Sequence, residues 1–410
     1  MSDLPRPTDA PCDETPSQVA VEPGEDAAAG MTGAQLAEAR EYRRLGLWCT
    51  LLDRAIDLAF LGVMALVLAR PLDAWLRTWP LADRWWSLRL AALFLVMFAL
   101  HVTVSLPLSY YAGFVLEHRF KLSTLSAAGW AWRYAKMLAL ALLFGLVLAL
   151  GLFWIIWTTG PWWWLVGTGA FFLVGVMLAR IWPVVIEPLF YTIERLDRPD
   201  LHERLARLAQ GTGLAIEGVY RIALSEETVK ANAQLAGLGQ TRRVLLGDTL
   251  LDQFSPEEIE VVFAHEIGHH VLHHVRKLIL AGLAFSAAGF WACDGVLVAW
   301  VGRWEPVLDY AAMPVYAFPM AMFFLTALRT VLGPLGHAIS RRYERQADRY
   351  ALARTGLREA FRSAFCKLAQ QNKDDPSPPR LEVLLLHSHP PIAERLALAG
   401  APAPGDQAPP

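Results

Sequence analysis

Long apolar stretches alternate with charged segments along this chain, and six of them are long enough to cross a lipid bilayer. A helix needs roughly 20 mainly apolar residues to span the hydrocarbon core, because each residue adds only about 1.5 Å. The six stretches are Leu51–Ala69, Leu88–Leu116, Tyr134–Trp157, Trp162–Pro183, Leu278–Val301 and Ala311–Leu335. Only residues 158–161 separate the third from the fourth, which predicts a helical hairpin. The pattern predicts a mostly α membrane protein with about six transmembrane helices, or seven.

Basic residues in the short loops predict which way these helices face, because Lys and Arg collect on the cytoplasmic side. They lie between the second and third stretches, before the fifth and after the sixth, at Arg119, Lys121, Arg133, Lys136, Arg276, Lys277, Arg341, Arg342 and Arg345. The opposite loops contain Arg303, with the first loop as the exception at Arg70, Arg77 and Arg84. We therefore expect both termini and the segment from about 190 to 277 in the cytoplasm.

Six ionisable residues fall within or beside the apolar stretches, namely Asp53, Asp57, His101, Glu187, Asp294 and Arg329. Such groups are costly in a membrane and usually face a bundle interior or water. Two interpretations remain open for them. They either pair with one another or reach the interface, or they line a water-filled chamber.

The pattern changes between about 193 and 277 to that of a small α+β domain. An amphipathic helix, a strand and a hairpin with a glycine-containing loop are expected over Asp200–Gly211, Gly218–Leu224 and Asn232–Leu251. Ser255 followed by Pro256 and two acidic residues is typical of a helix start. The helix that begins there is expected to run through the sequence EEIEVVFAHEIGHHVLHHVRK to Lys277.

Composition agrees with a membrane protein and excludes several other classes. Of 410 residues, 55% are hydrophobic and 16 are tryptophan, with a mean hydropathy of +0.32. The net charge of −2 gives no reason to expect nucleic acid as a partner. The four cysteines are scattered without a CxxC pair, so neither a thiolate metal site nor a disulfide framework is predicted. Residues 1–40 and 401–410 are expected to be disordered tails, the first of them acidic.

The candidate chemistry lies on the helix after Ser255. His265 and His269 are four residues apart, so they share one helix face and can bind one metal ion. Glu266 is rotated by about 100° from His265, as suits a base that acts on bound water without binding the metal. Gly268 leaves room for another backbone to approach. The three further histidines, His270, His273 and His274, are expected to form a solvated polar helix end near the membrane surface.

A catalytic zinc site requires a third protein ligand and one open position. Glu344 and Asp348 again lie four residues apart on a helical stretch beyond the last two apolar segments. We predict Glu344 as the third zinc ligand. Asp348 is expected to hold a ligand histidine through its ring N–H. One zinc ion per chain is predicted, with Glu266 accepting a proton from the attacking water and passing it to the leaving amine.

Several motifs, in order, resemble the CAAX prenyl protease 1 family of integral membrane zinc endopeptidases and, more distantly, the HtpX-like proteases. They are FVLEHRFKLS at Phe114–Ser123, PLFY at Pro188–Tyr191, KANAQLAGLGQTRRVLLGDTLL at Lys230–Leu251, HEIGHH at His265–His270, SRRYERQAD at Ser340–Asp348 and HSHPPIAER at His387–Arg395. The resemblance covers about residues 41–398. Departures are SEETVKA before Asn232, which lacks a histidine found there in some eukaryotic members, and six spans in place of seven.

The resemblance implies a helical barrel around a large water-filled chamber, with the protease site facing inward near the cytoplasmic side. It implies that Asn232 and Ala233 lie on a strand edge where substrate docks by β-addition. It also implies that His389 and Arg395 approach the metal, where both would stabilise a developing oxyanion. The expected location is a bacterial inner membrane. The expected partners are the lipid bilayer and a peptide or membrane-protein substrate.

The predicted organisation follows from the patterns and the resemblance together. A tail over 1–40 precedes a four-helix transmembrane region over 41–190, a soluble protease segment over 191–277, two transmembrane helices over 278–336, a C-terminal protease segment over 337–400 and a tail over 401–410. The alternatives are a membrane-protein quality-control protease of the HtpX type and a non-catalytic zinc-stabilised scaffold. A site buried in the bilayer is disfavoured because the HExxH segment is too charged, and a transporter because no internal symmetry is visible.

Overall fold

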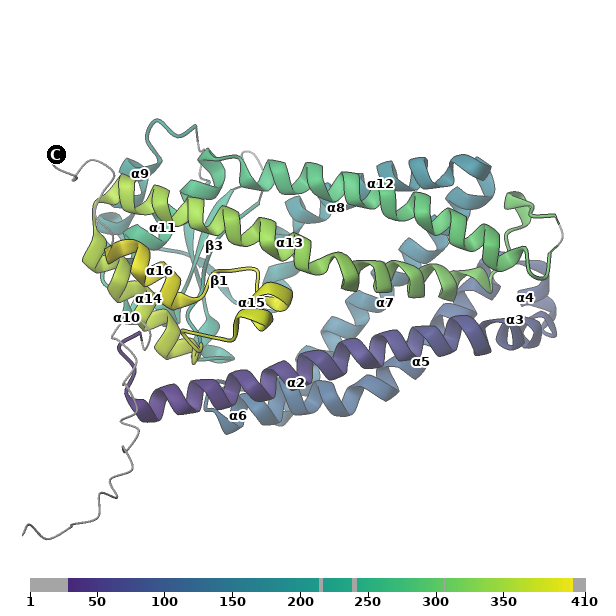
Figure 1. Cartoon of the computed structure of the whole chain (residues 1–410), viewed down its shortest axis with the longest axis horizontal. Coiled ribbons are helices and arrows are strands. Elements are labelled where there is room, and N and C mark those ends of the chain that lie inside the picture. Colours follow the sequence, from purple (N-terminus) through teal and green to yellow (C-terminus); the bar gives the residue numbers. More distant parts are fainter. Residues whose placement is uncertain (1–28, 214–216, 238–241, 306, 401–410) are drawn as a thin grey trace, which may run out of the picture.

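The computed structural model describes residues 29–400 apart from 214–216, 238–241 and 306. Long helices run beside one another along the longest axis of the molecule, and a small sheet lies at one end (Figure 1). Residues 1–28 of the expected N-terminal tail and the whole expected tail over 401–410 lie outside the described residues. Helix α2 begins at Gly33, so residues 33–40 are helical and the expected boundary at 40 is wrong. A reciprocal cap between Thr32 and Gln35 starts this helix, and Leu36 and Ala39 are buried in the core around the sheet.

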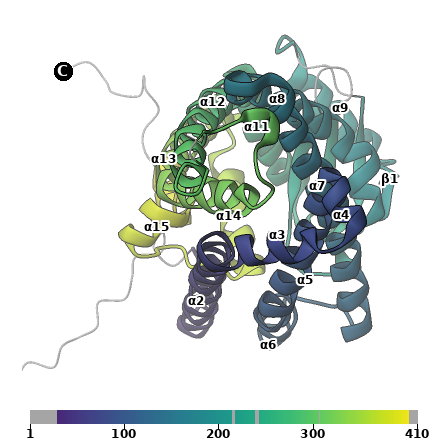
Figure 2. The same cartoon turned by 90° about the vertical axis from the view of Figure 1, so that its right-hand side faces the viewer.

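Among the described residues, six long helices make up the part of the molecule that contains the candidate membrane spans. They are α2 (Gly33–Val63), α5 (Trp86–Tyr110), α7 (Ala127–Thr159), α8 (Trp163–Ile181), α12 (His274–Val301) and α13 (Ala317–Thr355). Viewed end-on, they stand around the axis of the molecule (Figure 2). Shorter helices complete this part, namely α3 (Ala69–Arg77), α4 (Pro80–Arg84) and α6 (Glu117–Arg119), with π-helical turns at Met64–Leu68, Tyr111–Leu116 and Trp182–Ile186.

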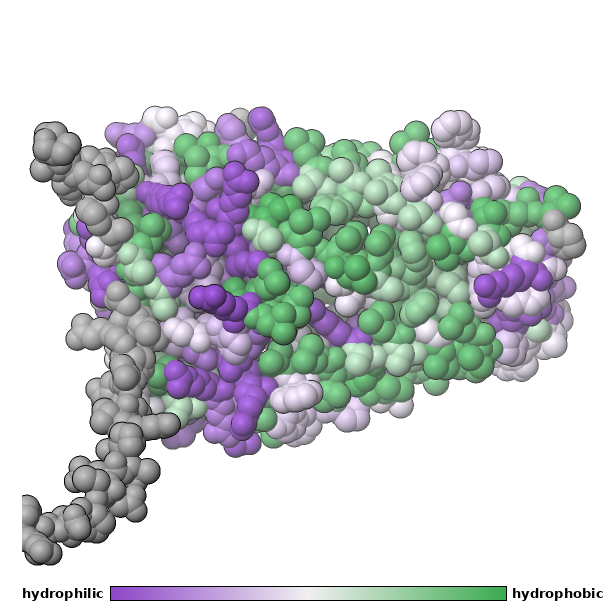
Figure 3. Space-filling view, viewed as in Figure 1, coloured by the Kyte–Doolittle hydropathy of each residue, from purple (hydrophilic) through white to green (hydrophobic). Residues whose placement is uncertain are grey.

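Four helical stretches in the described part of the chain are long and apolar enough to cross a membrane, at Trp86–Arg119, Ala127–Leu189, His274–Val301 and Ala317–Thr355. The second contains both helices of the expected hairpin, which turns at Gly160 with φ +56°. The weakest of the six expected spans, on α2, is not among these four, so the number of six stays a prediction. Figure 3 shows the apolar surface of this part beside the hydrophilic end that contains the sheet.

The ionisable residues of the apolar stretches mostly have polar partners. His101 Nε2 lies 2.8 Å from Asp57 Oδ1, and Asp294 accepts hydrogen bonds from Trp163 and Tyr310. Glu187 accepts one from Gln234. Pairing therefore accounts for these residues, and the water-filled chamber stays a prediction.

Within the described part of the chain, the sheet contains four strands in the order β1-β2-β4-β3. Their bounds are β1 Ile193–Arg195, β2 Gly218–Ile222, β3 Ala233–Ala236 and β4 Arg243–Gly247. Strands β2 and β4 are parallel, whereas β3 pairs with β4 in the expected antiparallel hairpin. Within the described residues β3 is an edge strand, so one row of its backbone groups has no strand partner. The predicted amphipathic helix is α9 (Pro199–Ala209), and α10 (Asp248–Gln253) follows β4.

Helix α11 (Pro256–Val271) begins where the sequence predicted. The Ser255 side chain accepts from the Glu258 backbone, while the Glu258 carboxylate accepts from the Ser255 backbone. The helix does not continue to Lys277 as expected. His273 adopts a left-handed conformation with φ +58°, and α12 starts at His274 in a new direction. The HExxH helix and the following membrane helix are therefore two elements joined by a tight turn.

Helix α13 runs without a break for 39 residues from the membrane part into the sheet-containing end. It thus crosses the boundary expected at 336/337, and α12 crosses the one expected at 277/278. It also begins at Ala317, not Ala311, because Tyr310–Ala312 form a separate 3₁₀ turn capped by Asp309. The chain ends with α14 (Arg358–Asn372), α15 (Arg380–Leu386) and α16 (Ile392–Gly400), packed against α11 and α13.

Candidate metal centre

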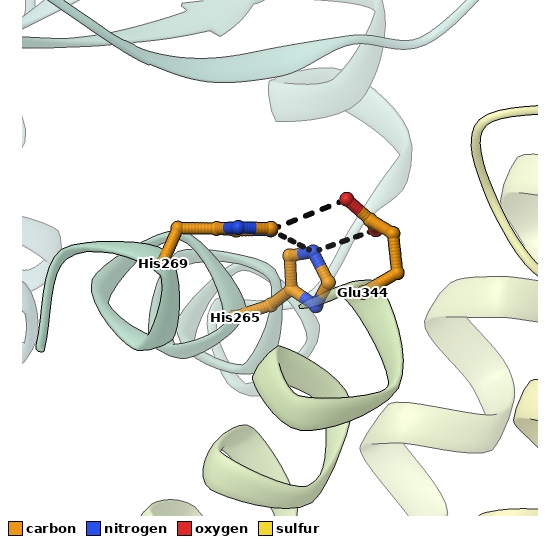
Figure 4. A group of neighbouring side chains, drawn as sticks. All are labelled: His265, His269 and Glu344. Carbon is orange, nitrogen blue, oxygen red and sulfur yellow. Dashed lines mark hydrogen bonds and ion pairs between the residues drawn. The ribbon is translucent and has the colours of Figure 1, made fainter. Parts of the chain in front are cut away.

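Three side chains from α11 and α13 converge as predicted. His265 Nε2 lies 3.1 Å from His269 Nε2 and 3.3 Å from Glu344 Oε2, and His269 Nε2 lies 3.3 Å from Glu344 Oε1. The two histidines project from one helix toward the carboxylate on the other (Figure 4). One atom from each residue lies within 4.8 Å of the others. The i, i+4 spacing puts the two histidines on one face of α11, and the packing of α11 against α13 brings Glu344 to them.

Gly268 explains how α13 comes close enough to supply that carboxylate. A Cβ on this residue would lie 3.1 Å from Ala347 Cα and 3.3 Å from Ala347 O. Those contacts are tighter than most real Cβ contacts, and Tyr350 Cδ1 would lie at 3.2 Å as well. Glycine next to His269 therefore allows the helices to cross at this distance without displacing the α13 backbone.

Asp348 holds His265 from behind. Its Oδ1 lies 2.8 Å from His265 Nδ1, so the N–H of that ring points at Asp348 and Nε2 points at the other ligands. Arg395 on α16 donates from Nε to Asp348 Oδ2 at 2.9 Å and from Nη2 to Oδ1 at 2.5 Å. Burial by itself lowers the pKa of His265, but the neighbouring Asp348 and Glu344 carboxylates raise that pKa to about 9, so these carboxylates favour a positive charge on or beside the ring.

The donor set fits a metal cation. With the hydrogen of His265 on Nδ1, its Nε2 presents a lone pair toward the Glu344 carboxylate. Glu344 Oε2 is buried and accepts no hydrogen bond from the described residues. Acceptors that face one another in a buried place repel unless a proton or a metal cation lies between them. Two imidazole nitrogens and a carboxylate are also the ligand types of catalytic zinc sites.

A cavity of about 560 Å³ opens beside these ligands. Glu266 is half-buried on its wall, so the predicted base faces the same space as the ligands. Asn232 and Ala233 line it as well, which brings the edge of β3 to the metal centre. His389 lines it from the segment before α16, with its side chain 62% exposed and Nε2 3.5 Å from Glu344 Oε1. The enclosing protein lowers the pKa of His389 although water can reach the ring.

Arg395 lines the same cavity, and the expectation that it stabilises an oxyanion stays a prediction. Its guanidinium is buried, stacks at 3.8 Å over the Phe365 ring and donates to Asp348. Its Nη2 also lies 3.3 Å from His265 Nδ1, so Arg395 contacts both His265 and the carboxylate that orients it. The ion pair could not be read from the sequence, since Asp348 and Arg395 are 47 residues apart.

His274 is the residue that the sequence misjudged. It was expected to be solvated, but it is fully buried and stacks on Tyr343 with ring centroids 4.4 Å apart. Its Nδ1 lies 3.2 Å from Nδ1 of the ligand His269. Its Nε2 lies 2.9 Å from Gln346 Oε1 on α13. No spacing rule singles out this pair, because the contact depends on the turn at His273. His273 itself is exposed, as expected.

A helical membrane part that shares helix α13 with an HExxH site and its distant glutamate defines a membrane metallopeptidase. The chain belongs to peptidase family M48, which matches residues 195–402. Residues 18–192 match the family described as CAAX prenyl protease N-terminal, five membrane helices. That description has one membrane helix more than hydropathy predicted for this half. The resemblance stated from the motifs is thereby confirmed.

Individual relatives agree with this membership. The chain is 31% identical over 316 residues to CAAX prenyl protease 1 of Saccharomyces cerevisiae, covering 73% of this chain and 69% of the relative. It is 26% identical over 373 residues to the uncharacterized metalloprotease YhfN of Bacillus subtilis, covering 90% and 87%. The crystal structure of S. mikatae Ste24p is similar with a TM-score of 0.76 and 26% identity, covering 90% of this chain and 89% of that one.

Proposed function

We propose that this protein is a zinc endopeptidase of the CAAX prenyl protease type, with the ion held by His265, His269 and Glu344. The observation that carries the proposal is the convergence of these three groups beside Glu266 in one cavity. A bound zinc ion would supply Lewis-acid polarisation of a water molecule and of the substrate carbonyl. The chain's own residues supply proton transfer, orientation and substrate binding.

Glu266 is the general base in this proposal. It follows His265 directly, so the helix turns its carboxylate away from the ligand face but leaves it on the cavity wall. From there it accepts the proton of the attacking water. It then returns that proton to the amine that leaves when the peptide bond breaks.

The substrate is proposed to lie along β3. Strand β3 is paired only with β4 among the described strands, so its other edge can accept an extended peptide by main-chain hydrogen bonds. Asn232 O is already bonded to Gly247 N at 2.9 Å, which fixes the start of the strand. Because Asn232 and Ala233 also line the cavity, a peptide on this edge passes the three ligands.

His389 is proposed to stabilise negative charge on the carbonyl oxygen. Its ring lines the cavity, with Nε2 3.5 Å from Glu344 Oε1 and Nδ1 3.0 Å from Ser388 Oγ. A donor placed where charge develops lowers the barrier of such a reaction. Arg395 lines the cavity as well, and contacts both His265 and the Asp348 carboxylate that orients it.

The proposed substrate is a peptide of the prenylated CAAX type, and relatives named CAAX prenyl protease 1 support this choice. Quality control of membrane proteins is the second candidate, because the same chemistry serves both. The proposed location is a bacterial inner membrane with the site on the cytoplasmic side, supported by the basic loops. A single cysteine placed within residues 158–161 and labelled in intact cells tests this orientation. If that cysteine is protected from a reagent added outside the cells, the orientation is contradicted.

Cleavage of quenched peptides by the detergent-purified protein tests the activity. We expect chelator-sensitive cleavage that falls by at least about 100-fold in Glu266→Gln, while zinc content stays at one ion per chain. Two peptides that differ only in the prenyl group separate the substrate candidates. Unchanged cleavage in Glu266→Gln would overturn the assignment of the base, and equal rates on both peptides would overturn the prenylated substrate.

A further inference from the structure

The two histidines of the proposed metal site are held by different groups. His265 faces the carboxylate of Asp348. His269 has no carboxylate behind it, and its Nδ1 faces His274 Nδ1 at 3.2 Å. His274 in turn places Nε2 2.9 Å from the amide oxygen of Gln346. The row of groups Gln346, His274 and His269 thus leads from α13 through the first residue of α12 to the metal centre.

The hydrogen positions in this row follow from the chemistry of its far end. The Gln346 amide oxygen can only accept, so Nε2 of His274 carries the hydrogen. A neutral ring with its hydrogen on Nε2 has a lone pair on Nδ1. A short contact with that lone pair requires a donor, so His269 must place its own hydrogen on Nδ1. The Nε2 lone pair of His269 is then free and directed at Glu344 and His265.

The surroundings hold His274 in this orientation. Its ring is 0% exposed and lies nearly parallel to Tyr343, with an interplanar angle of 8°. Tyr343, Glu344 and Gln346 all belong to α13, so one helix supplies the stacking partner, the ligand and the acceptor. The left-handed turn at His273 brings His274 back toward α11. A fully buried imidazole with two directed contacts is a built feature of the site.

We propose that His274, oriented by Gln346, is a positioning residue that fixes the tautomer and direction of His269 for metal binding. The inference rests on the proposed metal site. A neutral imidazole and an amide here perform the role that a carboxylate performs at His265. Groups that orient a ligand histidine typically contribute 10–100-fold to metal affinity.

Two replacements of His274 separate positioning from packing. His274→Phe keeps an aromatic ring to stack on Tyr343 but removes the acceptor, whereas His274→Asn removes the ring but keeps an oxygen where Nδ1 stands. Zinc affinity is measured on the full-length detergent-solubilised protein by competition with a chelating indicator, together with the melting temperature of the metal-free form. We expect about 10–100-fold weaker binding in His274→Phe and a loss of at most about threefold in His274→Asn.

Gln346 provides an independent check, because Gln346→Leu removes the acceptor and Gln346→Glu keeps one. We expect weaker zinc binding in the first and affinity within about threefold of the unaltered protein in the second. His273→Asn is the matched control, since His273 is exposed and asparagine tolerates its positive φ. Unchanged affinity in His274→Phe, or equal losses in His274→Phe and His274→Asn, would overturn the proposal. His269→Ala tests the metal site itself, and full zinc binding in that variant would overturn the proposed function instead.

Discussion

Buried acidic residues occur at both ends of the molecule, but their partners differ. At the end away from the sheet, Asp73 is buried between Arg89, at 3.0 Å, and Arg77, at 3.2 Å. Asp294 there accepts hydrogen bonds from Trp163 and Tyr310. Each of these acids meets a donor. At the sheet-containing end, Glu344 instead faces the imidazoles of His265, His269 and His389, which can either donate a hydrogen or bind a metal ion.

The difference teaches how to distinguish a structural cluster from a functional one. Burial and proximity are common to both ends, so neither indicates chemistry by itself. Imidazoles and carboxylates that converge in a buried place favour a positive charge between them, which either protons or a metal cation can supply. Five substitutions test this comparison between the two ends, from the largest expected effect to the smallest.

Asp348→Asn is expected to have the largest effect. It leaves Arg395 buried beside a neutral amide and deprives His265 of its carboxylate, so the free energy of unfolding should fall by about 3–5 kcal/mol. Zinc affinity should also fall by about 10–100-fold. Thermal melting in detergent and chelator competition measure the two effects. Adding Arg395→Met should restore stability but not zinc affinity, and recovery of both would contradict the positioning role of Asp348.

His389→Ala is expected to lower turnover by about 100-fold with zinc affinity unchanged, because the ring acts on the developing charge and not on the metal. Peptide cleavage at saturating zinc and substrate measures this loss. His202→Ala is a suitable control, since His202 is on α9 and does not line the cavity. A loss of zinc in His389→Ala would show that His389 is a ligand instead.

Arg89→Met at the opposite end should reduce stability without changing the chemistry. Asp73 would then pair only with Arg77, whose side chain is 48% exposed. We expect the free energy of unfolding to fall by about 2–3 kcal/mol, which is less than for an acid left with no partner. The melting temperature should fall while zinc affinity and turnover of the folded protein stay the same. A large drop in zinc affinity would mean that the two ends are coupled and that the comparison fails.

Gly268→Ala should separate α11 from α13. The added methyl group would meet the Ala347 backbone, at a cost of about 1–3 kcal/mol, and zinc affinity should fall as Glu344 moves away. Gly169→Ala in α8 is the matched control, because nothing lies within 4 Å of its added Cβ. That variant should be neutral or slightly more stable. Equal effects of the two substitutions would contradict the close approach at Gly268.

Glu258→Gln is expected to have the smallest effect, and the effect should depend on pH. Burial raises the pKa of Glu258, but Lys367, Ser363 and the Ser255 backbone outweigh burial and hold it below its usual value. A lowered pKa in the folded state gives stability that is present above the unfolded pKa of about 4.3 and is lost as pH falls through the folded value. We expect a deficit of about 1 kcal/mol at pH 7 that closes below pH 4. A deficit that persists at low pH would contradict this origin.

Local signals in the sequence predicted much of the site. The i, i+4 pairs His265/His269 and Glu344/Asp348 needed only the helical period, and Ser255 marked the start of α11. The β3–β4 hairpin followed from two apolar runs and their glycines. The errors have a common cause. The burial of His274 and the ion pair of Arg395 both depend on contacts between residues that are distant in sequence.

The sequence by itself determined which residues can bind a metal and which segments are helical, because helix periodicity and residue chemistry are local properties. Only the tertiary structure decided how those residues are oriented. The crossing of α11 and α13 at Gly268 brings Glu344 to the histidines, and the turn at His273 directs His274 to His269. Which ring nitrogen carries a hydrogen depends on the neighbour it faces, and that neighbour is chosen by packing.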